Sequence, residues 1–160
     1  MNIQSFLAIG GMFILSLTSL RFNKAILTTS TVDIENKISL TAISLANDLI
    51  EEIKVKSFDK STTEFPTTNV LSLTSSANLG PDVGETYPNY NDIDDYNNFV
   101  RNIDAPHTEG YSVTCVIQYV EENNPNNVSS NQTFYKKVTV TVTNIYLSYP
   151  ITLSFIFTLK

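Results

Sequence analysis

The chain of 160 residues is poor in cysteine, histidine and positive charge, with one cysteine, one histidine and no tryptophan. Cys115 cannot form a disulfide within the chain, and Cys115 with His107 cannot supply a Cys/His zinc site. No haem-attachment motif occurs, which excludes covalent haem. Only 10 Lys and Arg residues face 16 Asp and Glu residues, for a net charge of -6. This balance argues against a nucleic-acid partner and against docking to an anionic membrane surface, since both require basic side chains.

Charge is missing altogether from the N-terminal segment. No charged residue occurs from Met1 to Leu20, and the run FLAIGGMFILSL from Phe6 to Leu17 is nearly all apolar. Twenty residues of helix rise about 30 Å, the hydrocarbon thickness of a bilayer. A signal peptide would need a basic stretch before this run and a small-residue cleavage site after it, and neither is present. We favour a membrane or helix-bundle environment over a buried core helix, which further helices would have to surround.

Proline and glycine are scarce behind the apolar run. No proline occurs before Pro66 and no glycine between Gly11 and Gly80, so nothing obliges the helix to stop. Apolar residues then recur every three or four positions in one stripe: Ile34, Ile38, Ala42, Leu45, Leu49 and Ile53. The pattern predicts a helix from about Ile3 to about Ser57, roughly 80 Å long, with its weakest point at Thr28–Thr31.

The C-terminal third changes to a period of two. Apolar residues alternate with mostly polar ones from Tyr111 to Tyr119, from Val138 to Val142 and from Ile151 to Leu159. This alternation predicts three half-buried strands, and strands that follow one another in this way are normally antiparallel neighbours. The apolar face of such a sheet needs a cover, which the stripe of the helix can provide. We therefore expect an α+β fold in which the apolar front half of a long helix protrudes and its rear half packs on a C-terminal antiparallel sheet.

This architecture divides the chain into a helix, residues 1–57, and a globular head, residues 58–160. The helix consists of a membrane or filament-core segment, 1–20, and an amphipathic segment, 21–57. The head consists of a variable loop, 60–109, and the antiparallel sheet, 110–160.

The combination resembles the type IV pilin and type II secretion pseudopilin family. SLANDLIEEIKVKSFD, from Ser44 to Asp59, is similar to the end of the long helix in such proteins, and YKKVTVTVT, from Tyr135 to Thr143, is similar to their central strand. The resemblance covers about two-thirds of the chain. It departs from the family pattern at Ser5, where a glutamate is usual, and in lacking a basic leader peptide. Either Met1 is the mature N-terminus, which we favour, or the protein uses a variant export route. The missing glutamate should change the registration of subunits rather than the fold.

The resemblance implies a structural subunit of an extracellular pilus-like filament that acts in adhesion, surface contact or motility. The apolar segment would hold the subunit in the inner membrane and then form the core of a helical homopolymer built by pilus or secretion machinery. Its expected members are Phe6, Leu7, Ile9, Gly10, Gly11, Phe13, Ile14, Leu15 and Leu17. Two alternatives remain: a minor pseudopilin of a type II secretion system, and a single-pass membrane protein that presents a binding domain outside the cell.

The middle of the chain holds a metal-site hypothesis. In NDIDDYNN, the oxygens of Asp92, Asp94, Asp95 and Asn97 lie close together in sequence, and hard oxygen ligands suit calcium. Some pseudopilins bind calcium in the equivalent loop. The spacing is not that of an EF-hand, and a solvated acidic turn is the alternative. No other cofactor is expected.

Other candidates for chemistry are few. Asn127 and Asn131 each begin an N-glycosylation sequence pattern and lie in a predicted loop. The alternative is that the pattern occurs there by chance and no glycan is attached. Cys115 falls on the apolar side of a predicted strand, which predicts a buried, inert thiol. His107 lies beside Pro106 without a nucleophile in a recognisable motif. Because no acid/base or nucleophile constellation can be assembled, we expect the protein not to be an enzyme.

Overall fold

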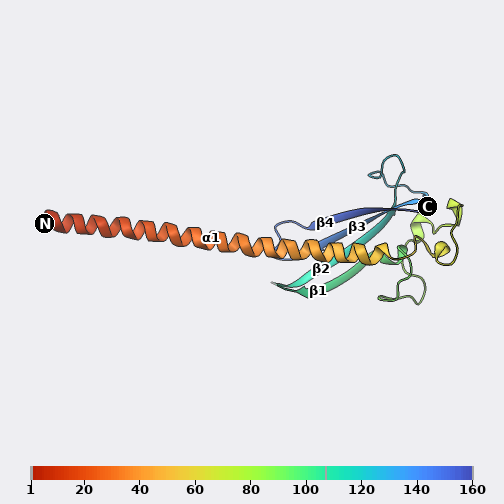
Figure 1. Cartoon of the computed structure of the whole chain (residues 1–160), viewed down its shortest axis with the longest axis horizontal. Coiled ribbons are helices and arrows are strands. Elements are labelled where there is room, and N and C mark those ends of the chain that lie inside the picture. Colours follow the sequence, from red (N-terminus) through yellow and green to blue (C-terminus); the bar gives the residue numbers. More distant parts are fainter. Residues whose placement is uncertain (1, 107, 160) are drawn as a thin grey trace. The chain divides into compact units, whose positions relative to one another are not determined.

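The computed structural model describes residues 2–106 and 108–159, so that Met1, the expected N-terminus, and His107 lie outside the described residues. One long helix is followed by short 3-10 helices and four strands (Figure 1). The elements are α1 (Ile3–Lys54), η1 (Lys60–Thr62), η2 (Val70–Ser72), η3 (Ser76–Asn78), η4 (Asp94–Tyr96), β1 (Phe99–Ala105), β2 (Thr108–Tyr119), β3 (Tyr135–Thr143) and β4 (Ile151–Thr158). The chain divides into two compact units, Met1–Lys37 and Ile38–Lys160.

The first unit is the front part of α1, and it remains helical through Thr28–Thr31, where we expected the weakest point. The hydroxyl of Thr28 donates to the carbonyl of Lys24 at 2.9 Å, and those of Thr29 and Thr31 donate to carbonyls four residues back in the same way. These polar side chains therefore find their hydrogen-bond partners on the helix itself.

The second unit begins with the rear part of α1, which lies across one face of the sheet (Figure 1). The predicted stripe is confirmed here: Ile38, Ala42, Leu49 and Ile53 are buried, Leu45 is half-buried, and Ala46 and Ile50 widen the buried face. Ile34, the first member of the predicted stripe, is exposed and belongs to the first unit. The amphipathic pattern thus buries a side of the helix only from Ile38 onward.

The helix ends at Lys54, three residues before the predicted end at Ser57. Ser57 is instead held by the segment before η4: its N–H donates to the carbonyl of Asn91, and its own carbonyl accepts from the N–H of Ile93. These long-range backbone bonds replace the hydrogen bonds that a further helical turn would have made.

Two buried alanines sit where α1 meets the sheet, and replacing one of them should destabilise the protein. Ala42 and Ala46 are fully buried and lie one turn apart. We expect Ala46→Leu to lower the free energy of unfolding by about 1–3 kcal/mol, because the added carbons must displace packed neighbours. Urea denaturation measures this, with Asn47→Leu, at the exposed neighbouring position, as the control. Equal stabilities for both variants would contradict tight packing at Ala46.

The sheet has four antiparallel strands in the order β1-β2-β3-β4. The strands β2, β3 and β4 correspond to the three predicted ones. The strand β1 was not predicted. It lies inside the segment 60–109, so the expectation that this whole segment is a loop is wrong. Its sequence, FVRNIDA, lacks a regular alternation, and Phe99 is its one buried residue. The strand forms by backbone pairing with β2 at the sheet edge, which an apolar pattern cannot reveal.

The core of the second unit lies between α1 and the two central strands. Every second residue of β2 from Tyr111 to Tyr119 is buried, as are Val138, Val140 and Val142 of β3. The prediction of half-buried central strands is therefore confirmed. The edge strand β4 is less covered, and Phe155 on it remains exposed, with the ammonium of Lys54 4.4 Å from its ring centre.

Candidate functional site

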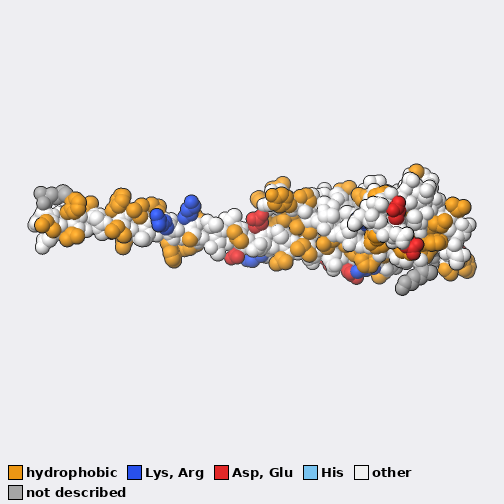
Figure 2. Space-filling view, turned by 90° about the horizontal axis from the view of Figure 1, so that it is seen from above, with side chains coloured by type: hydrophobic (Ala, Val, Ile, Leu, Met, Phe, Trp, Pro, Cys, Tyr) orange, Lys and Arg blue, Asp and Glu red, His pale blue; other side chains and the backbone are white. Residues whose placement is uncertain are grey.

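Every residue from 2 to 34 is exposed, which includes the uncharged apolar front of α1 up to Leu20. Figure 2 shows hydrophobic side chains along this part of the helix, with basic side chains behind them. The large predicted core residues, Phe6, Leu7, Ile9, Phe13, Ile14, Leu15 and Leu17, are between 46% and 74% exposed. Gly10 and Gly11 are also open to the surroundings, because a Cβ atom added to either would have no atom within 4 Å beyond the adjoining backbone of the helix. By length and composition, α1 could cross a membrane.

A cluster of charged side chains is buried in the second unit. Asp59, Asp92, Asp94, Asp95 and Lys136 are each at most 3% exposed. Asp59 caps η1, the next three aspartates surround the start of η4, and Lys136 is on β3. The alternative of a solvated acidic turn is therefore wrong, because the aspartates of NDIDDYNN face the interior. We call these five residues the buried charge cluster.

Lys136 enters the cluster because it lies on the core face of β3. Alternate residues of a strand face the same side, and Lys136 belongs to the same alternating set as Val138, Val140 and Val142, whose side chains fill the core. Its ammonium lies 4.4 Å from the ring centre of Phe58 and 5.1 Å from that of Tyr119, its neighbour across β2. Two aromatic faces thus line this cation in an interior that excludes water.

Asp59 is the most extensively bonded carboxylate of the cluster. It accepts from the backbone N–H groups of Ser61 (3.1 Å) and Thr74 (2.9 Å), and from Nζ of Lys136 at 2.9 Å. Burial by itself raises the pKa of Asp59, but the charge of Lys136 and these hydrogen bonds outweigh it and lower the pKa to about 2. Asp59 is therefore held as an anion.

Asp94 differs from Asp59 although both face the same lysine. Nζ of Lys136 lies 2.6 Å from Oδ1 of Asp94, and the two side chains form a buried ion pair. Within the described part of the chain, both carboxyl oxygens of Asp94 are buried with no hydrogen-bond partner. Burial raises the pKa of Asp94 to about 7, against the lowering effect of Lys136. Asp94 therefore keeps its proton to a much higher pH than Asp59 does.

Asp92 and Asp95 shape the backbone around η4. Oδ2 of Asp95 accepts from the N–H groups of Asn91 and Asp92, and Oδ1 of Asp92 accepts from the N–H of Asp94. Burial, followed by the nearby charge of Asp95, raises the pKa of Asp92 to about 7. These hydrogen bonds hold the backbone of the turn in place. Ionisation of Asp92 lowers the stability of the fold, because it puts a negative charge in the interior.

The raised pKa of Asp92 predicts a pH dependence of stability. The folded pKa of about 7 exceeds the ordinary value of 3.8, so folded Asp92 retains a proton that the unfolded chain has lost in this interval. Stability from this group is complete below about pH 4 and is lost as the pH rises towards 7, by up to about 1.4 kcal/mol per pH unit. Urea denaturation between pH 4 and pH 8 measures it. Asp92→Asn should flatten this part of the curve, and an unchanged slope would contradict the prediction.

The calcium hypothesis for Asp92, Asp94, Asp95 and Asn97 stays a prediction. The structure brings the three carboxylates together but uses Asn97 elsewhere: its Oδ1 accepts from the N–H of Ile117, and its Nδ2 donates to the carbonyl of Leu79. Among the described residues, no group of three or more His, Cys, Asp or Glu side chains is arranged to hold a metal ion.

A melting experiment decides whether calcium binds. If calcium binds, millimolar calcium should raise the melting temperature over chelator, because binding to the folded state alone stabilises it. The shift should disappear in Asp95→Asn. Identical melting temperatures in calcium and in chelator would exclude the site.

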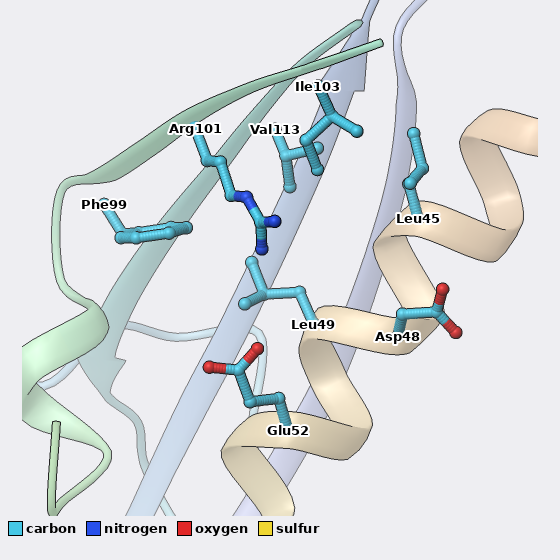
Figure 3. A pocket seen from close by; sticks show the side chains of 8 residues that line it. All are labelled: Leu45, Asp48, Leu49, Glu52, Phe99, Arg101, Ile103 and Val113. Carbon is cyan, nitrogen blue, oxygen red and sulfur yellow. The ribbon is translucent and has the colours of Figure 1, made fainter. Parts of the chain in front are cut away.

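A pocket of about 200 Å³ lies between α1 and β1 (Figure 3). Its polar groups are connected: Tyr96 and Tyr87 donate to the two carboxylate oxygens of Glu52, at 2.7 and 3.3 Å, and Arg101 donates to the Tyr87 hydroxyl at 3.0 Å. In Figure 3 the guanidinium of Arg101 points across Leu49 towards the helix. This network joins the edge strand to the helix and explains how β1 is held despite its weak apolar pattern.

The remaining predicted residues are placed as follows. Asn127 and Asn131 are exposed in the segment between β2 and β3, and Nδ2 of Asn127 donates to Glu121 at 3.1 Å. Their glycosylation stays a prediction. Cys115 is buried, and burial raises the pKa of its thiol to about 12, so the prediction of a buried, inert thiol is confirmed.

Sequence reasoning missed Asp59 and Lys136 as partners of the NDIDDYNN aspartates. One signal was available for Lys136. In YKKVTVTVT, Lys136 is separated from the buried valines by even numbers of residues. Side chains at such positions lie on the same face of a strand, so the sequence predicts that Lys136 faces the core. A buried lysine requires an anionic or carbonyl partner, but the sequence does not say which of 16 acidic residues provides it.

The architecture of the chain, a long N-terminal helix with an apolar front part and a rear part packed on an antiparallel sheet, is pilin-like. No protein-family model, curated protein or solved structure matches the sequence.

Proposed function

We propose that this protein is the structural subunit of an extracellular, type IV pilus-like filament, polymerised through the apolar front of α1. The observation that supports this most strongly is the exposure of an uncharged apolar segment on a continuous helix. The large side chains from Ile3 to Leu20 are all at least 46% exposed. Burying each of them stabilises the chain by about 1.5–3 kcal/mol, so the segment has a strong drive to leave water.

Two environments satisfy this drive, and a filament subunit uses both in turn. A bilayer holds the segment before assembly, since about 20 apolar residues span its hydrocarbon layer. Copies of the same helix replace the lipid afterwards. A contact between different surfaces of identical subunits, related by a rotation that does not close, generates a helical polymer.

The second unit is suited to the outside of such a polymer. It has its own core between α1 and the sheet and therefore does not need the front of the helix to fold. Its segment between β2 and β3 is polar and exposed and would present the filament to its surroundings. Assembly machinery and an inner-membrane stage are parts of this proposal.

Electron microscopy of material sheared from cells that express the chain, with mass spectrometry of the same fraction, tests the proposal. We expect thin filaments whose main component is this polypeptide. Retention of the protein in the membrane fraction without filaments would contradict a major subunit. A few copies at the ends of filaments made of another protein would identify a minor pseudopilin, and an isolated monomer in the membrane would identify an anchored binding domain.

A further inference from the structure

We propose that Lys136 and Asp94 condense to an intramolecular isopeptide bond that joins β3 to η4, with Asp59 as the proton relay. The bond would run from Nζ of Lys136 to Cγ of Asp94. It would be a covalent cross-link inside the second unit, and it is independent of whether the protein forms filaments.

The reacting groups are already in contact. Nζ of Lys136 lies 2.6 Å from Oδ1 of Asp94 and 2.9 Å from Oδ2 of Asp59. The side chains of Lys136 and Asp59 are 0% exposed and that of Asp94 is 3% exposed. Because three separate segments supply them, the fold converts a bimolecular reaction into an intramolecular one, and high effective concentration is a large part of such a reaction's rate.

The surroundings keep bulk water away from the reacting nitrogen. Lys136 is fully buried, and its Nζ lies against the rings of Phe58 and Tyr119. A lysine in such a setting becomes a nucleophile when it passes a proton to a neighbouring carboxylate, because the neutral pair avoids the cost of two buried charges. The exclusion of water also removes the competing nucleophile that would reverse the reaction.

The two carboxyl groups that face Lys136 have different roles. Asp94 is the electrophile, because its carboxyl is in contact with Nζ of Lys136 and no other side-chain hydrogen bond among the described residues fixes it. A neutral acid accepts an amine at carbon far more readily than a carboxylate anion does. Asp59 is fixed by the N–H groups of Ser61 and Thr74, and its Oδ2 lies 2.9 Å from Nζ of Lys136, so it is the group placed to receive a proton.

The step balances without an oxidant, a reductant or a cofactor. A proton first moves from the Lys136 ammonium to the Asp94 carboxylate, which gives an amine and a carboxylic acid. The nitrogen lone pair then attacks Cγ of Asp94, and the nitrogen releases one proton to Oδ2 of Asp59. Asp59 returns that proton to the hydroxyl that leaves Cγ. The C–N bond forms, one C–O bond breaks, and one water molecule is released.

Mass spectrometry of the intact, denatured full-length protein tests the bond directly. We expect the mass to be lower than that of the sequence by one water molecule. Trypsin should then yield one branched peptide, in which 61–101, which contains Asp94, is joined to 102–137, which contains an uncleaved Lys136. A wild-type mass equal to that of the sequence would overturn the proposal. So would a linkage of 102–137 to 57–60, the peptide of Asp59, or a loss of water located elsewhere.

Variants separate the roles of the residues. Lys136→Arg retains the positive charge and Asp94→Ala removes the electrophile, and both should show the full mass of the sequence. Lys137→Arg is the matched control at the next position and should retain the loss of water. The measurement on the wild-type protein decides the question even if a variant does not fold.

Asp59→Asn tests the relay. The amide keeps the size of the side chain but cannot accept a proton, so the linked fraction should form about a hundredfold more slowly, as is typical when a general base is removed. The reaction is followed by intact mass at intervals after refolding of unlinked chain, isolated in urea before it has folded, with circular dichroism to show that the chain has folded. Linkage at the wild-type rate in folded Asp59→Asn would exclude the relay.

Discussion

Lys136→Met should lower the free energy of unfolding by about 3–5 kcal/mol, because the variant leaves Asp59 and Asp94 buried without the Lys136 nitrogen that pairs with both of them. Nζ of Lys136 is within 2.9 Å of oxygens of both Asp59 and Asp94, and it also donates to the carbonyl of Phe58 at 2.8 Å. Methionine fills a similar volume, so packing alone should change little. Urea denaturation measures the loss.

The control is Lys137→Met, at the half-buried position next along β3, which should stay within about 0.5 kcal/mol of the wild-type protein. A second signature distinguishes lost charge from poor packing. Without the lysine, the carboxylates can relieve their repulsion only by protonation, so the stability of the variant should rise more steeply than that of the wild-type protein as the pH falls from 8 to 5. Wild-type stability in Lys136→Met would show that the buried charge cluster does not hold the fold together.

Ile14→Asp should remove the protein from membranes and prevent assembly. Ile14 is 64% exposed in the middle of the uncharged segment. An aspartate at the centre of a membrane-spanning helix costs about 2.5–3.5 kcal/mol on insertion scales, which corresponds to about a hundredfold lower partitioning. The same charge would be buried without a partner in a bundle of helices. Fractionation of cells and electron microscopy of sheared material measure the two effects.

Asn23→Asp is the matched control, because it adds the same charge just behind the uncharged segment and should leave membrane partitioning nearly unchanged. The melting temperature of the second unit should be the same in both variants, since its core begins at Ile38. Filaments of normal abundance from Ile14→Asp would contradict a filament core made by this segment.

Local periodicity was sufficient to predict α1 and three of the four strands. The stripe from Ile38 to Ile53 and the alternation in β2 and β3 each mark a buried side on a regular element, so the pattern of burial can be read from the residues alone. The exposed apolar front of the helix was also predictable, because the sequence has 20 residues without charge and no second helix that could cover them.

Edge pairing was not predictable. The strand β1 has one buried residue, Phe99, and it is held by backbone hydrogen bonds to β2 and by the network from Arg101 to Glu52. Any sequence without proline can make such backbone bonds, so the residues do not mark them. The early end of α1 has the same cause, because distant residues Asn91 and Ile93 bind Ser57.

The sequence by itself determined which segments bury apolar side chains and that a long uncharged helix begins the chain. Only the tertiary structure decided that the NDIDDYNN aspartates turn inward and meet Asp59 and Lys136. The physical reason is that buried charges pair through space. Lys136 and Asp59 are 77 residues apart in the sequence, and no periodic pattern in the sequence identifies one as the partner of the other. Apolar burial repeats along the chain, whereas the pairing of buried charges depends on how the elements come together.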